Sequence, residues 1–325
     1  MLLREGSRPL TEPNRASVLS VYRWWTFARS GPFARWWPFV LLLVAGASRW
    51  VVVAVHPEAD STLASEAVGC TWAALVSLAF FPRQPSRIAP QAARPGSHPL
   101  RNLLAGAMLF GGPAIALLIH VPQFDVTGLT ISLALTPVVI AIAASAFGTE
   151  SSEGIAGRIW PGLAAVAGLL LILAQPTLGD ARSDLALCLA PILTGVGAAL
   201  FCADLPDSTS RVTLALTGAA ALFALALAGA YVFSGVRPSL PLLAVAGDGL
   251  LALLGMATLA QLGATRWSSQ FTWVPLLIVL EGIALIRPKL TAYWVVGLVL
   301  LFLASVYLLL PQTEDPDPNP SIVPG

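Results

Sequence analysis

Apolar residues gather in ten segments along this chain, and polar and charged residues fall mainly in the short stretches between them. Each segment is close to the length of about 20 residues that a helix needs to cross a lipid bilayer. We place the segments at 37–55, 61–81, 102–121, 127–147, 158–175, 185–203, 211–234, 241–263, 269–286 and 291–310. The pattern predicts an all-α integral membrane protein with ten transmembrane helices and no inserted soluble domain.

The composition supports this prediction. The chain has 325 residues, of which 56% are hydrophobic and 11% are charged, and its mean hydropathy is +0.78. A soluble domain is about 25% charged, so this chain has too little charge to be one. No basic run is interleaved with aromatic residues, which argues against nucleic acid as a partner. The three cysteines lie in apolar segments without CxxC spacing, so we expect no metal site and no cofactor.

Lysine and arginine are distributed unevenly between alternate loops. If the N-terminus is cytoplasmic, the cytoplasmic side holds thirteen of them and the outside holds four. Positive residues favour the cytoplasmic side, so we expect a multi-pass protein of the inner (cytoplasmic) membrane with both termini in the cytoplasm. Residues 1–36 then form a cytoplasmic or interfacial segment. Residues 311–325, which are acidic and proline-rich, form a disordered tail.

Two stretches of the chain, 127–150 and 265–288, resemble one another. When Pro137 is aligned with Pro275, each becomes a long apolar helix with one internal proline, followed by a short polar turn and another apolar helix. Matching kinked helices frame the substrate site in transporters built from two repeats. Because each half has five helices, an odd number, the second repeat is inverted relative to the first. The two repeats are placed at 37–177 and 183–310.

Two local motifs carry a family resemblance. The fourth segment reads Leu-Thr-Pro at 135–137 and ends in Phe-Gly-Thr-Glu at 147–150, and the fifth, GLAAVAGLLLILAQP at 162–176, has spaced glycines. With five plus five helices and a proline-bearing fourth helix in each half, the chain resembles the EamA-like family of the drug/metabolite transporter superfamily. The resemblance covers about residues 37–310. It implies two inverted five-helix repeats and transport of small molecules.

Four charged residues lie inside the predicted spans, namely Arg49, Glu66, Asp248 and Glu281. A charge at the centre of a membrane helix costs about 2.5–3.5 kcal/mol to insert, so each is a functional candidate. At about 1.5 Å per residue, all four lie about 8–10 Å below the outer surface, which favours one polar cluster. We expect Arg49 to pair with Glu66 or Glu281, while another carboxylate takes a proton or a substrate ammonium. The alternative is that Glu66 and Asp248 lie at the membrane interface.

The ninth segment carries a second group of candidates. Gln270 and Glu281 are spaced to share one face of a helix. Pro275 has no backbone N–H, so the carbonyl four residues earlier is free for another partner or for a substrate. Trp273 could stack on a substrate. The alternative for the proline and the tryptophan is a packing role.

Three further candidates lie in the first half of the chain. Thr136 and Pro137 belong to the Leu-Thr-Pro step, where the proline again leaves a carbonyl without its helical partner. Trp50 directly follows Arg49 and could also stack on a substrate. Packing is again the alternative.

These patterns favour a secondary transporter that exports or exchanges a small polar metabolite by alternating access. We expect the small-molecule substrate between the halves, near the first, third, fourth, sixth, eighth and ninth segments, with a proton or substrate gradient as the energy source. The lipid bilayer surrounds the protein, and a homodimer is left open. The alternative is a non-transporting membrane scaffold or accessory subunit with a transporter-like fold. The sequence has no nucleophile elbow, metal-ligand spacing or phosphate loop, so we do not expect an enzyme.

Overall fold

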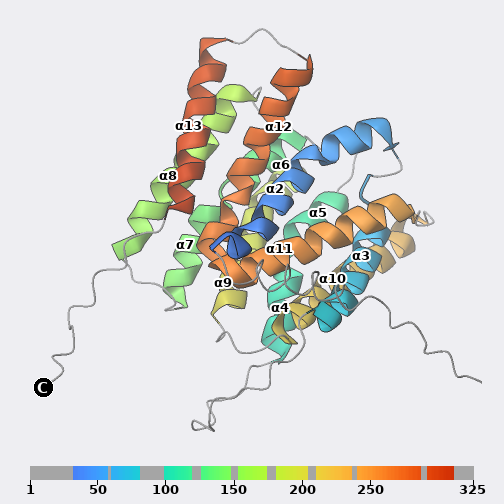
Figure 1. Cartoon of the computed structure of the whole chain (residues 1–325). Helices are drawn as coiled ribbons and strands as arrows, with labels where there is room; N and C mark the ends of the chain where they lie inside the picture. The colour runs from blue at the N-terminus through green and yellow to red at the C-terminus, as the bar shows by residue number, and fades with distance from the viewer. Residues whose placement is uncertain are drawn as a thin grey trace, which may run out of the picture. The chain divides into compact units, whose positions relative to one another are not determined.

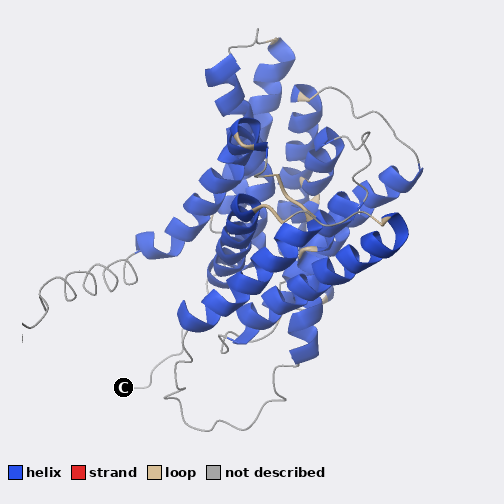
Figure 2. Cartoon of the chain, turned by 90° about the vertical axis from the view of Figure 1, so that its right-hand side faces the viewer, coloured by secondary structure: helices blue, strands red, loops and turns tan. Residues whose placement is uncertain are grey.

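The secondary structure of the protein is helical. A computed structural model describes residues 32–57, 60–80, 99–118, 126–147, 153–173, 181–203, 210–235, 240–286 and 291–310. Within these ranges the elements are α-helices and no strand occurs (Figure 2). The all-α prediction is confirmed for this part of the chain. The predicted tail 311–325 and all but the last five residues of the predicted segment 1–36 lie outside the described residues.

The helices follow the predicted apolar segments. In the labels of Figure 1 they are α2 (Pro32–Val55), α3 (Leu63–Phe80), α4 (Pro99–Leu109), α5 (Gly111–Leu118), α6 (Val126–Leu133), α7 (Thr136–Ala146), α8 (Glu153–Ile172), α9 (Ala181–Cys202), α10 (Ser210–Ser234), α11 (Leu242–Ser268), α12 (Gln270–Ile286) and α13 (Ala292–Leu309). Their bounds agree with the prediction to within five residues. Two predicted segments are each divided: the third into α4 and α5, and the fourth into α6 and α7.

Several of these helices can cross a membrane. Judged by length and composition, five candidate spans are Trp36–Val55, Gly128–Ala146, Arg211–Phe233, Leu242–Ser268 and Ala292–Leu309. The α4–α5 pair, which is bent by 46°, would make a sixth. The shorter apolar stretches, of 10–17 residues, are Leu63–Leu78, Ile159–Ile172, Leu187–Cys202 and Gln270–Ile286. Large apolar side chains are exposed on these helices, among them Phe233 at 92% and Leu242 at 81%. A helical membrane protein with several spans agrees with these features.

The proline of the fourth segment does not lie in the middle of a helix. α6 ends at Leu133 and α7 begins at Thr136, so Pro137 is the second residue of α7. Proline is tolerated there because the first N–H groups of a helix have no intrahelical partner. Pro275, in contrast, lies inside α12. Gly128–Ala146 forms one candidate span, and Pro137 lies just after a break within it. The two prolines therefore occupy matching segments but different local structures.

α11 changes direction near its end. Gly263 has φ +77° and ψ 170°, which lie outside the helical region. Glycine adopts positive φ readily because it has no Cβ. This residue therefore redirects the chain into 264–268 before α12 begins. The predicted end of the eighth segment, residue 263, coincides with the kink.

The helices pack around two groups of buried apolar residues. The first joins α3, α4, α5, α7, α9, α10 and α11, and includes Phe201, Phe223 and Met256. The second joins α6, α8, α12 and α13 around Leu169 and Leu301. In Figure 1, α13 runs beside α8, and α11 runs beside α3.

Glycines allow two of these helix pairs to approach closely. A Cβ on Gly168 of α8 would lie 2.7 Å from the carbonyl oxygen of Gly297 on α13, and the reverse distance is 2.6 Å. A Cβ on Gly69 of α3 would lie 2.8 Å from the backbone nitrogen of Gly249 on α11. Small residues are the usual means by which membrane helices come into contact. The α3–α11 contact fixes the start of α3 against the part of α11 that carries Asp248.

Candidate functional site

A cavity of about 340 Å³ lies among the described helices. Of its twenty lining residues, fourteen are apolar or glycine, and the polar ones are Arg49, Glu66, Thr130, Thr194, Asp248 and Gln270. The polar residues come from α2, α3, α6, α9, α11 and α12, and α4 and α5 add apolar side chains. Helices from both predicted halves therefore line the cavity.

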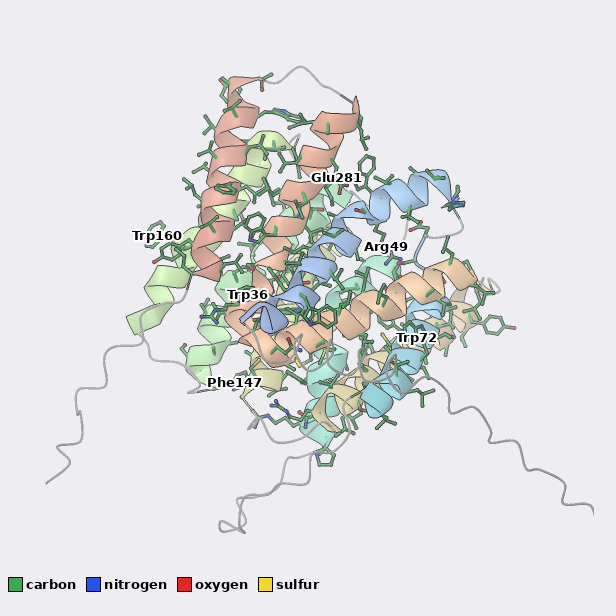
Figure 3. All side chains as sticks on the ribbon, in the orientation of Figure 1. Trp36, Arg49, Trp72, Phe147, Trp160 and Glu281 are labelled. Atoms are coloured by element: carbon green, nitrogen blue, oxygen red, sulfur yellow. The ribbon has the colours of Figure 1, made fainter. Side chains whose placement is uncertain are left out.

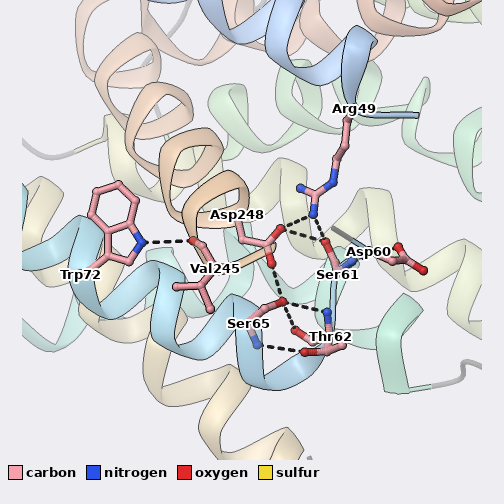
Figure 4. A network of polar contacts seen from close by, with 8 residues as sticks. All are labelled: Arg49, Asp60, Ser61, Thr62, Ser65, Trp72, Val245 and Asp248. Carbon is pink, nitrogen blue, oxygen red and sulfur yellow. Dashed lines mark hydrogen bonds and ion pairs between the residues drawn. The ribbon is translucent and has the colours of Figure 1, made fainter. Parts of the chain in front are cut away.

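Asp248 of α11 is the centre of a polar network in the cavity wall (Figure 4). One carboxylate oxygen, Oδ1, accepts from Arg49 of α2 and from the Ser61 hydroxyl at 2.9 Å. The other, Oδ2, accepts from the Ser65 hydroxyl at 2.5 Å. Arg49 also forms an ion pair with Asp248 and donates to Ser61. The aspartate side chain is 0% exposed and the arginine side chain 25%, so the network is largely shielded.

The start of α3 places its serine against Asp248. The Ser65 amide donates to the Thr62 hydroxyl at 3.0 Å, and the Thr62 amide donates to the Ser65 hydroxyl at 2.8 Å. This reciprocal arrangement caps the helix and holds Ser65 in place. The Trp72 indole N–H donates to the Val245 carbonyl of α11 at 3.1 Å and ties the two helices further along (Figure 4). The positive end of the α3 helix dipole also stabilises the negative charge of Asp248, whose carboxylate lies at the start of α3.

Glu66 supplies the second carboxylate of the cavity wall. Its side chain has no hydrogen bond or ion pair within the described chain. The charges that act on it are those of Asp248, which repels it, and Arg49, which attracts it. Because Arg49 is already paired with Asp248, the wall holds one guanidinium and two carboxylates. With Glu66 ionised, the site has an excess of negative charge.

The partner of Arg49 differs from the prediction. It pairs with Asp248, so the predicted pairing with Glu66 or Glu281 is wrong. Three of the four predicted charged residues line the cavity, but Glu281 does not. The predicted single polar cluster is therefore divided.

Glu281 belongs to a separate link between α12 and α2. Its carboxylate accepts from the Trp50 indole N–H at 2.9 Å and from the Ser48 hydroxyl at 3.3 Å. Arg49 therefore reaches α11, whereas Ser48 and Trp50, on either side of it in sequence, reach α12. Figure 3 labels Arg49 on α2 and Glu281 on α12.

The other predicted residues of α12 have different surroundings. Gln270 and Pro275 line the cavity, as expected of a substrate site. Trp273 does not line it; its ring lies edge-on to Phe302 of α13, with centroids 5.9 Å apart. The tryptophan is therefore placed for helix packing and not for stacking on a molecule in the cavity.

Thr136 and Pro137 are buried at the start of α7 and do not line the cavity. Sequence reasoning, in turn, misses Ser61, Ser65 and Thr194. The two serines stand in a polar stretch that indicates a helix start, but nothing in it points to a carboxylate far along the chain. Thr194 is 2% exposed, and its hydroxyl oxygen has no hydrogen-bond partner among the described residues. A single threonine in an apolar segment gives no signal of this position.

α2 is held differently from the other helices around the cavity. Every other helix that lines the cavity packs closely against at least one neighbouring helix of the described chain, whereas α2 packs closely against none. It reaches its neighbours through side chains: the Arg49 and Trp50 links described above, and Val274, which lies 3.3 Å from the position of a Cβ on Gly46. α2 therefore closes one side of the cavity without a close approach of backbones.

Comparison with known proteins identifies the fold and no function. No protein-family model matches the sequence, and no curated protein matches it. Thirteen chains of solved structures are similar to it. One of them, described only as "Crystal structure of protein", is 14% identical, with a TM-score of 0.58 over 84% of this chain and 98% of that chain. At this identity the likeness shows a shared helical fold.

Proposed function

We propose that this protein is a secondary transporter that moves a small organic solute across a membrane by alternating access. The observation that carries the proposal is a cavity bounded by helices of both predicted halves, with the Arg49–Asp248 ion pair in its wall. Charges within membrane segments are costly and commonly mark a solute or ion pathway. Transporters built from two repeats bind their substrate between the repeats.

We further propose that all ten segments cross the membrane as two inverted five-helix repeats, 37–177 and 183–310. The helix packing supports this arrangement. In two five-helix repeats, each segment corresponds to the one five places along the chain, so α3 corresponds to α10 and α8 to α13. Exchanging the repeats therefore leaves the helix pairs α3–α10 and α8–α13 unchanged. The same correspondence relates the helix pair α4–α10 to the pair α11–α3, and the pair α7–α8 to the pair α12–α13. All six of these pairs pack closely.

Other features agree with a transporter of this kind. The Leu-Thr-Pro step and the glycine-spaced fifth segment resemble EamA-like transporters. The excess of lysine and arginine in alternate loops, thirteen against four, supports a place in the cytoplasmic membrane with both termini inside. A gradient of protons or of a second solute would supply the energy.

Alternating access can be tested before the substrate is known. Gly255 of α11 lines the cavity, and a Cβ there would meet nothing within 4 Å, so Gly255→Cys should fold. The variant is prepared with the exposed Cys188 replaced by alanine. It is treated with a membrane-impermeant maleimide in right-side-out and in inverted vesicles. Ala304→Cys, at a position of α13 that is 3% exposed, is the matched control.

A transporter opens the cavity to each side in turn. The thiol at position 255 should therefore react from both sides of the membrane, and the thiol at position 304 from neither. Reaction at position 255 from one side only, even after long exposure, contradicts alternating access and favours the non-transporting scaffold.

A further inference from the structure

The cavity wall contains a carboxylate without a counter-charge. Asp248 accepts from three side chains and pairs with Arg49, whereas Glu66 has no hydrogen-bond or ion-pair partner in the described chain. An unpaired charge in low-dielectric surroundings is unfavourable. Either a proton on Glu66 or a cation beside it would remove that penalty, whereas an anionic ligand would increase it.

The rest of the wall suits an organic cation better than a metal ion. Hard metal ions take about six oxygen ligands at short distances, but the six polar lining residues are spread over six helices. A volume of about 340 Å³ lies in the range of sites for small organic molecules. Phe110, Trp267 and Phe271 line it, and the last two rings are 5.3 Å apart, edge to face. Aromatic faces attract organic cations.

The α9 wall supplies a second polar group that has no protein partner. Thr194 lines the cavity at 2% exposure, and its Oγ1 makes no hydrogen bond within the described chain. A buried hydroxyl without a partner is costly. Because this oxygen is itself buried, a ligand in the cavity does not reach it, and Glu66 and the apolar wall are the features that select the ligand.

We propose that the cavity binds a monocationic amphiphile, a protonated amine whose head lies at Glu66 and whose apolar body lies along the aliphatic and aromatic wall. The inference rests on the proposed function, because this same cavity would carry the solute across the membrane. It changes the expected substrate class from a small polar metabolite to a molecule with one charged end and one apolar end.

Three probes of similar size and different charge test the proposal. They are 2-phenylethylamine, 2-phenylethanol and 3-phenylpropionate. Equilibrium binding to the full chain in lipid nanodiscs is measured at neutral pH, with empty nanodiscs as the blank for partition into lipid. The amine should bind saturably and about tenfold or more tightly than the other two. This comparison is made on the unaltered protein and does not depend on any variant folding.

Variants then locate the site. Glu66→Gln should weaken amine binding about tenfold or more, to the level of the alcohol. Asp60→Asn, the corresponding change at an exposed carboxylate that does not line the cavity, should leave amine binding unchanged. Gly255→Leu places a side chain in open space of the cavity and should abolish saturable binding of every probe. Equal binding of the three probes, undiminished binding to Glu66→Gln, or no saturable binding of the amine would each overturn the proposal.

Failure of this inference is distinguishable from failure of the transport function. If 3-phenylpropionate binds best and the thiol of Gly255→Cys reacts from both sides, the transporter stands and the preference for a cation is wrong. If the amine binds through Glu66 but the thiol reacts from one side only, the cation site stands and transport is wrong.

Discussion

Breaking the Arg49–Asp248 ion pair should loosen α2 from α11. α2 belongs to no closely packed helix pair of the described chain. Buried apolar side chains such as Phe39 and Ala47 also hold it, so the ion pair is one of several contacts between α2 and its neighbours. The variants are Arg49→Met and Asp248→Leu, singly and together. Each replaces a charged side chain by an apolar one of comparable size, which limits the effect of lost volume.

The structure sets the order of the effects. Arg49→Met leaves a carboxylate that is 0% exposed and has lost its counter-charge, and we expect a loss of about 3 kcal/mol of unfolding free energy. Asp248→Leu leaves a guanidinium that is 25% exposed and can turn toward water in the cavity, so we expect about 2 kcal/mol. The double variant removes both charges and should lose about 2–3 kcal/mol, which gives a coupling energy of about 2–3 kcal/mol.

The assay is equilibrium unfolding of the purified protein in mixed micelles with increasing sodium dodecyl sulfate. Asp60→Asn is the control, because this exposed carboxylate accepts only the neighbouring Ser61 amide among the described residues, at 2.9 Å. It should change the unfolding free energy by less than about 0.5 kcal/mol. If the two single losses add in the double variant, the residues are not coupled and the reasoning is refuted. A larger loss for Asp248→Leu than for Arg49→Met would contradict the argument from exposure.

Four further substitutions test the packing. Gly249→Ala would place a Cβ on the Trp72 indole ring and should lower the unfolding free energy by about 1–3 kcal/mol. Gly247→Ala, where a Cβ meets nothing within 4 Å, should leave it unchanged or raise it by up to about 1 kcal/mol; equal effects of the two would contradict the close α3–α11 contact. Gly263→Ala, at φ +77°, should cost about 1–2 kcal/mol in the same unfolding assay, and a neutral result would argue against the kink. Thr136→Val removes a fully buried hydroxyl without a partner in the described chain. It should raise the melting temperature by the equivalent of up to about 1 kcal/mol, and a fall would mean that the hydroxyl is needed.

The helices could be predicted because their signal is local. A run of apolar residues bounded by arginine, proline and glycine identifies a segment without knowledge of its neighbours, and all ten segments correspond to helices in the structure. The break between α6 and α7 could not be predicted in the same way. Proline at the start of a helix and proline within one have the same sequence signal, and the surrounding packing decides between them. That choice differs between Pro137 and Pro275.

The charged residues of the site were predictable, and their partners were not. A charge within an apolar segment is conspicuous, and its depth follows from the helical rise. Depth alone does not say which way a side chain points around the helix. Arg49 and Trp50 are neighbours in sequence but reach different helices, which is why Arg49 pairs with Asp248 and not with the expected Glu66 or Glu281. The apolar lining of the cavity had no signal at all, because a leucine that faces a cavity and one that faces lipid look the same in sequence.

The difference between α2 and α9 bears on the proposed mechanism. Under a shift of five segments these two helices are counterparts. α9 packs closely with α4 and α7, whereas the corresponding pairs, α2–α11 and α2–α12, are joined through the side chains of Arg49 and Trp50. If the halves are inverted repeats, they exchange conformations when the transporter changes state. The opposite state is then one in which α2 approaches α11 and α12 closely and α9 withdraws. Because Arg49 holds Asp248 in the wall that also carries Glu66, a cation that binds there acts on the link that holds α2 in its present position.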